Sequence, residues 1–128
     1  MRPSFIGALV ANPSGSHQLV NERQGRVVAT TVLPAFDSAS RKTGLLKHQS
    51  MPTGAAMIIA PSSAIHTFFM RFPIDVAFVA KSGRVLKTVH ALGPWRIAGA
   101  LRAYAVIELA AGTLARTDTE PGDTLVVI

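Results

Sequence analysis

Hydrophobic residues of this chain fall into short runs, interrupted about every eight to twelve residues by glycine, proline or polar residues. This spacing is typical of a domain built from many short strands. The runs at 54–60, 74–80 and 104–110 are apolar at almost every position, which predicts strands covered on both faces. The pattern therefore predicts an α+β domain that is mostly β, with a small barrel-like sheet of antiparallel or mixed strands.

Glycine-containing turns between strand patterns predict two hairpins. The first has strands at 17–22 and 26–33 around Arg23-Gln24-Gly25, and the second has strands at 74–80 and 84–90 around Lys81-Ser82-Gly83. Glycine suits such turns because it adopts the left-handed backbone conformation without steric cost.

The segment 37–47 is predicted to form the main helix. Asp37 or Ser38 can accept hydrogen bonds from the free amides of its first turn. Gly44 weakens a helix by about 1 kcal/mol relative to alanine, so the helix either ends nearby or packs closely there. A shorter helical turn is predicted at 113–119, ahead of the last strand.

The length of 128 residues predicts a single domain over 1–128, with its core at 26–128 and a peripheral segment at 1–15. The absence of cysteine excludes disulfides, thiolate metal sites and thiol catalysis. No run reaches the ~18 apolar residues that a membrane-spanning helix needs. Residues 5–11 are either an apolar start to the fold or a targeting remnant. We expect a soluble, cytoplasmic protein.

The net charge of +6 permits anionic partners. The basic residues are scattered, however, and only Arg41 and Lys42 are adjacent. The sequence shows no array of aromatic and basic residues of the kind that marks an RNA-binding sheet, so nucleic-acid binding through net charge is a weaker alternative.

Asp75 and Glu108 each interrupt an apolar strand. A buried carboxylate is costly unless it is paired or accepts hydrogen bonds. For Asp75 we expect Arg71, Arg41 or backbone amides of 62–73 as partners, and for Glu108 we expect Arg41 or Arg71. Each carboxylate is either a structural anchor or part of a site, and both alternatives stay open here.

Several short motifs from Arg41 onward resemble the DUF192 family, also called UPF0127, of uncharacterised small bacterial and archaeal proteins. The matching groups, in order, are Arg41, Gly44 and Leu45; Met70, Pro73, Ile74, Asp75, Val76 and Phe78; Gly83, Arg84 and Val85; Glu108, Leu109, Ala111, Gly112 and Thr113; Pro121, Gly122 and Asp123. This chain departs from the commoner pattern at Phe69, where the family has tryptophan, and in a shorter connection to Pro73. The resemblance implies a compact, mostly β fold and supplies no catalytic residues.

The sequence predicts a small binding module for an anionic ligand or a protein partner, with its site where the 61–73 loop meets Arg41, Trp95 and Glu108. The proposed roles are Arg71 facing the anion, Asp75 and Glu108 orienting it, and Phe69, Phe72 and Trp95 as apolar walls; Arg41 is a further ligand-binding residue.

The alternative is a hydrolase that uses Asp75 and His66 as an acid–base pair. No cofactor and no metal are predicted, because His66 has no metal-motif spacing with the other histidines. Met51, Met57 and Met70 are expected to pack in the core rather than to bind a metal through their thioethers.

Overall fold

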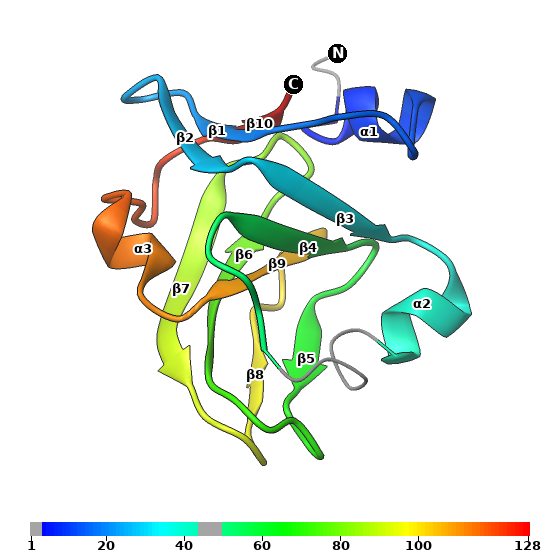
Figure 1. The fold of residues 1–128 in the computed structure, drawn as a ribbon, viewed down its shortest axis with the longest axis vertical. Helices are drawn as coiled ribbons and strands as arrows, with labels where there is room; N and C mark the ends of the chain where they lie inside the picture. Colours follow the sequence, from blue (N-terminus) through cyan, green and yellow to red (C-terminus); the bar gives the residue numbers. More distant parts are fainter. Residues whose placement is uncertain (1–3, 44–49) are drawn as a thin grey trace.

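The computed structural model describes residues 4–43 and 50–128, and within them the chain forms three sheets and three short helices (Figure 1). The largest sheet has five strands in the order β3-β4-β9-β6-β7. Their bounds are β3 (Thr31–Ala35), β4 (Ala55–Ile59), β9 (Ala105–Ala110), β6 (Ile74–Val79) and β7 (Val85–Leu92). β3 and β4 are parallel, and the other neighbouring pairs are antiparallel.

Two smaller sheets lie at opposite ends of the five-stranded sheet in Figure 1. The three-stranded one, at the top, has the order β10 (Leu125–Val127), β1 (Leu19–Asn21), β2 (Arg26–Ala29). The other, at the bottom, pairs β5 (Ala64–His66) with β8 (Ile97–Gly99). The helices are α1 (Gly7–Ala11), α2 (Ser38–Thr43) and α3 (Thr113–Arg116).

The mostly β, α+β class predicted from the pattern is confirmed, and both predicted hairpins are present. Gly25 and Gly83 have φ of 64° and 91°, the conformation for which glycine was expected there. The predicted strand 26–33 is divided at Thr30, because β2 and β3 belong to different sheets. The described strands thus form three sheets rather than one closed barrel.

The predicted helix at 37–47 is confirmed over Ser38–Thr43, and residues 44–47 lie outside the described part of the chain. Asp37 caps it as expected, since its carboxylate accepts hydrogen bonds from the Ser40 amide at 2.7 Å and the Ser40 hydroxyl at 2.8 Å. The bond from the Ser40 amide is the main cause that lowers the pKa of Asp37 below its ordinary value, and the bond from the Ser40 hydroxyl lowers it further.

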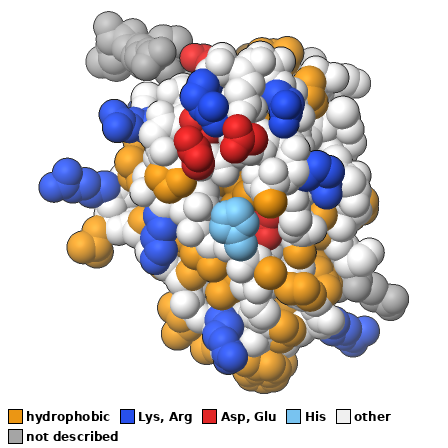
Figure 2. Space-filling view, turned by 90° about the vertical axis from the view of Figure 1, so that its left-hand side faces the viewer, with side chains coloured by type: hydrophobic (Ala, Val, Ile, Leu, Met, Phe, Trp, Pro, Cys, Tyr) orange, Lys and Arg blue, Asp and Glu red, His pale blue; other side chains and the backbone are white. Residues whose placement is uncertain are grey.

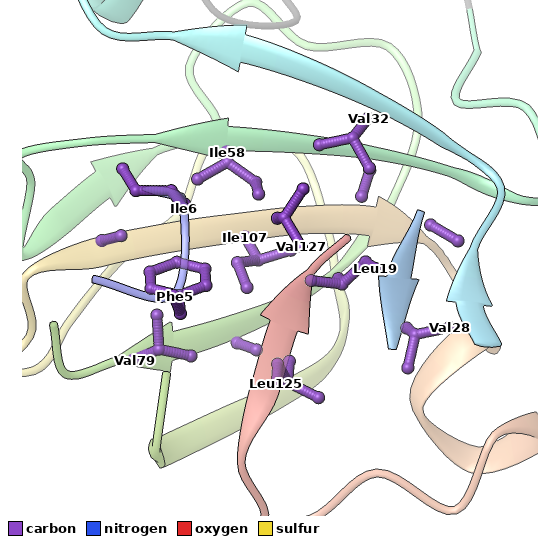
Figure 3. Packing of buried hydrophobic residues seen from close by; sticks show 14 of the residues in the cluster. Phe5, Ile6, Leu19, Val28, Val32, Ile58, Val79, Ile107, Leu125 and Val127 are labelled. Atoms are coloured by element: carbon purple, nitrogen blue, oxygen red, sulfur yellow. The ribbon is translucent and has the colours of Figure 1, made fainter. Parts of the chain in front are cut away.

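One face of the five-stranded sheet packs against α1 and the three-stranded sheet. Figure 3 shows Ile58, Val79 and Ile107 pointing towards side chains from the N-terminal segment, β1 and β10. The expectation that residues 1–15 lie at the periphery is wrong for Phe5, which is buried in this core. The Phe5 amide also donates a hydrogen bond to the Lys81 carbonyl, and the Phe5 carbonyl accepts one from the Val127 amide. This segment is therefore part of the packed structure.

The opposite face carries a second cluster, which we call the methionine face. It contains Ala35, Met51, Ala55, Met57, Ile59, Met70, Ile74, Val76, Phe78, Val106 and Ala110. Ile65 of β5 and Ala98 of β8 pack against it, so the small β5–β8 sheet covers this side. The three methionines pack in the core as the sequence predicted.

Candidate functional site

Asp75 is fully buried on β6 and ties three backbone segments together. Its Oδ1 accepts a hydrogen bond from the Ala91 amide at 2.8 Å, and its Oδ2 accepts bonds from Gly112 at 3.1 Å and Leu114 at 2.9 Å. A carboxylate that accepts several amide bonds is satisfied without a cation. The arginine and 62–73 partners predicted for Asp75 are therefore wrong; the amides come from the end of β7 and the start of α3.

Glu108 lies on β9 and faces the methionine face, because its neighbours Val106 and Ala110 belong to that cluster. It is 3% exposed and has no hydrogen-bond or ion-pair partner among the described residues. Burial raises its pKa to about 7. The predicted pairing with Arg41 or Arg71 is wrong within the described residues, where the ion pairs are those of Arg23.

Asp75 and His66 do not form the predicted acid–base pair. His66 is exposed on β5, where its Nδ1 accepts a hydrogen bond from the Phe68 amide at 3.3 Å. β5 covers the methionine face, whereas Asp75 points to the opposite side of the sheet, alongside Ala77 and Val79 of the other core. Both Asp75 oxygens are already occupied, so the structure removes the geometry on which the hydrolase alternative depended.

A group of three aromatic residues, the half-buried Phe68 and the exposed Phe69 and Trp95, lies where the loop after β5 meets the loop before β8; we call it the aromatic tip. The Phe68 and Trp95 rings are stacked with centroids 5.7 Å apart, and Phe69 meets Trp95 at 4.7 Å. His66 stacks on Phe68 at 4.9 Å. Phe69 is 69% exposed and Trp95 is 55% exposed, so these contacts leave much of each ring open to solvent.

Thr67 joins the two loops beneath the aromatic tip, and it is fully buried. Its hydroxyl donates to the Gly93 carbonyl at 2.6 Å and accepts from the Arg96 amide at 2.9 Å. Its amide donates to the Arg96 carbonyl at 2.8 Å, and its carbonyl accepts from the amides of Met70 and Trp95. Nothing in the sequence singled out Thr67, because a threonine between His66 and Phe68 also fits a strand.

Two bulky residues of the aromatic tip have left-handed backbone conformations, Phe69 with φ of 68° and Trp95 with φ of 63°. This conformation costs a residue with a side chain roughly 1–2 kcal/mol. Such strain persists where surrounding bonds enforce it and is concentrated at functional sites. Here the Thr67 bonds enforce it, and the outcome is that two aromatic side chains are held at the surface.

The predicted site residues are only partly brought together. Phe69 and Trp95 are in contact, and Arg71 follows Phe69 as an exposed residue. Phe72 is half-buried against the methionine face. Arg41 donates to the Phe36 carbonyl beside α2, and Asp75 is on the far face of the sheet, so neither joins the aromatic tip.

The surroundings of the aromatic tip are basic and apolar. Arg96 adjoins Trp95, and the next residue, Ile97, is 72% exposed. In Figure 2 hydrophobic side chains gather at the lower end with Lys and Arg beside them, while acidic side chains lie higher on that face. The loops of the aromatic tip are at this same lower end in Figure 1.

The structure defines a small, mostly β domain with an exposed aromatic and basic surface. A family model, DUF192, described as "Uncharacterized ACR, COG1430", matches residues 19–127. The chain therefore belongs to the DUF192 family, as its motifs predicted. No curated protein matches it.

Two solved structures share the fold. A crystal structure of a candidate transcription regulator from Sinorhizobium meliloti 1021 is 25% identical, with a TM-score of 0.74, over 85% of this chain and 89% of that chain. A protein of unknown function from Novosphingobium aromaticivorans DSM 12444 is 23% identical, with a TM-score of 0.73, over 86% of this chain and 82% of that chain. In the described residues, no helix has the length and apolar character needed to cross a membrane.

Proposed function

We propose that this protein is a binding module whose aromatic tip docks an acidic, partly apolar segment of a protein partner. The observation that carries the proposal is the contact of Phe69 with Trp95, two rings that remain exposed although apolar rings favour burial; the half-buried Phe68 also stacks on Trp95. Tryptophan and arginine are also the residues that most often dominate binding energy at protein interfaces.

The distribution of charge supports an acidic partner. Residues 62–117 contain seven lysines and arginines and only two carboxylates. Those two are Asp75 and Glu108, both buried. The exposed ionised groups of this segment are therefore cationic, with Arg71 and Arg96 nearest in sequence to the aromatic rings. An acidic segment would be attracted, and an exposed lysine-rich one repelled.

The exposure of the rings favours a protein partner over a small anionic ligand. Small-molecule sites are typically concave and enclose most of the ligand surface. The rings of Phe69 and Trp95 instead stand out from two loops, with more than half of each residue exposed. An extended peptide could cover both rings and reach the arginines on either side.

Single-stranded nucleic acid is the competing partner, because bases also stack on aromatic rings flanked by arginine. The description of the Sinorhizobium meliloti protein as a candidate transcription regulator adds to the reason for testing it. The exposed aliphatic side chain of Ile97 suits a peptide better than a base. The cytoplasmic location expected from the sequence stays a prediction.

A displayed random-peptide library tests the proposal directly. Selection on the wild-type protein, with counter-selection on a Phe69→Ser/Trp95→Ser variant, is expected to enrich peptides that combine Asp or Glu with apolar residues. Val10→Ser is the matched control, since Val10 is an exposed apolar residue, 57% exposed, on α1 at the other end of the molecule. No enrichment, together with tight and salt-sensitive binding of single-stranded oligonucleotides, would contradict a protein partner.

A further inference from the structure

Glu108 and Met57 lie directly opposite each other on adjacent strands, β9 and β4. Directly opposed residues of an antiparallel pair have their Cβ atoms about 4.5–5.5 Å apart, on the same face. Met51 and Met70 belong to the cluster on this face. Three thioethers and a carboxylate without a described hydrogen-bond partner are thus gathered on the methionine face.

The three methionines are slightly more exposed than most other residues of the methionine face. Ile74, Val76, Phe78 and Val106 of the methionine face are fully buried, whereas Met51, Met57 and Met70 are 8%, 7% and 6% exposed. Ala55 and Ala110, at the same end of β4 and β9, are 6% and 7% exposed, and their side chains are small. Within the methionine face, these three methionines and two alanines are therefore the residues nearest to solvent.

We propose that Glu108, Met57, Met70 and Met51 form a binding site for a soft monovalent cation of the Cu(I) class. Thioether sulfur selects soft ions over Mg²⁺, Ca²⁺ or Mn²⁺, which prefer oxygen. One carboxylate neutralises one monovalent charge, so the loaded site carries no net charge inside an apolar cluster. A divalent ion would leave an uncompensated positive charge there, which is costly.

The proposal does not rest on the proposed function of the aromatic tip, although Met70 follows Phe69 in sequence. It departs from the expectation that the chain binds no metal. The methionines pack as the sequence predicted, but one-dimensional spacing did not reveal that they gather around a carboxylate. Met57 is 51 positions before Glu108 in sequence, so only the register of β4 on β9 places them together.

Silver(I) is the probe, because it is soft, monovalent and inert to oxidation by air. We expect native mass spectrometry in chloride-free buffer to show one Ag(I) retained per chain at one equivalent. Competition titration is expected to show about tenfold or greater loss of affinity in Met57→Leu and in Met70→Leu, since each removes a sulfur ligand and keeps the volume. Ile59→Leu, within the same cluster, is the matched control and should bind as the wild type does.

Glu108→Gln is expected to weaken Ag(I) binding at least as much, because it removes the neutralising charge. If that variant does not fold, the methionine variants still decide the question. Failure of the wild-type protein to retain Ag(I) would overturn the proposal. Equal Ag(I) affinity in Met57→Leu, Met70→Leu and wild type would also overturn it, because the ion would then be bound elsewhere, for example by exposed histidines. Zn(II) binding as tightly as Ag(I) would overturn the assignment to a soft ion.

Discussion

Asp75 and Glu108 lie on neighbouring strands one register position apart, yet their side chains point to opposite faces of the same sheet. Asp75 is opposite Leu109, and Val76 is opposite Glu108. Because side chains alternate along a strand, the two carboxylates belong to different environments. Asp75 is satisfied by three amides, whereas Glu108 lies among methionines without a partner in the described residues.

Asp75→Asn is expected to destabilise the fold by about 2–3 kcal/mol, because the amide group cannot accept all three backbone hydrogen bonds. Urea unfolding at neutral pH measures the change, with Glu22→Gln, an exposed carboxylate, as the control. A loss of less than about 0.5 kcal/mol, the range of ordinary surface substitutions, would show that the three bonds contribute little.

Glu108 should make the metal-free protein less stable as pH rises from about 4.5 to 7. Its pKa in the folded state is raised from 4.5 to about 7, so in this window the folded state binds more protons than the unfolded state. Stability then falls by about 3 kcal/mol, at about 1.4 kcal/mol per pKa unit, and levels off above pH 7. Urea unfolding of wild type and Glu108→Gln across this range is the test, since the variant should lack the fall; parallel curves would refute it.

Asp123 should make the protein more stable as pH rises from about 2 to 4, which is the opposite of the effect of Glu108. Its hydrogen bond with Arg23 is the main cause that lowers its pKa from 3.8 to about 2, and the Glu120 amide and Asn21 also contribute. The carboxylate's contribution is complete above pH 3.8 and is lost as pH falls towards 2. We expect Asp123→Asn to flatten acid unfolding between pH 4 and 2, whereas Asp118→Asn, at an exposed position, leaves it unchanged. Identical acid unfolding in wild type and Asp123→Asn would argue against this account.

Thr67→Val should make the loops of the aromatic tip more mobile, because valine has nearly the same shape as threonine but lacks its hydroxyl. The change removes the hydroxyl bonds to Gly93 and Arg96 and leaves the Arg96 amide without its acceptor. We expect a loss of about 1–2 kcal/mol in urea unfolding. Trp95 should also become easier to quench with acrylamide. Thr88→Val on β7 is the control, and equal quenching in both variants would exclude this role for Thr67.

Much of the fold was predictable because local patterns decide it. Glycine turns specified the two hairpins, apolar runs specified β4, β6 and β9, and Asp37 specified the start of α2. The division at Thr30 was missed because an uninterrupted strand pattern does not show which sheet each half joins. β5 and β8 were missed because three-residue strands in a Pro- and Gly-containing sequence resemble loops.

The candidate site was predicted less well because it depends on tertiary contacts. Phe69, Arg71 and Trp95 were chosen from their residue types, and their role in binding stays a prediction. Asp75 and Glu108 were assigned to one site although side-chain alternation separates them. The partners of Asp75 are backbone amides up to 39 positions away, and amides carry no sequence signal. Thr67 was missed for a related reason, since its role lies in bonds to a loop 26–29 positions later.

The fluorescence of Trp95, the only tryptophan, tests the central proposal most directly. An acidic, apolar peptide from the library selection would be titrated into the protein while emission and acrylamide quenching are recorded. If the aromatic tip is the docking surface, emission shifts to shorter wavelength, quenching falls, and the affinity weakens with added salt. Calorimetric binding of the peptide with no change in Trp95 emission would place the interaction elsewhere and contradict the proposed function.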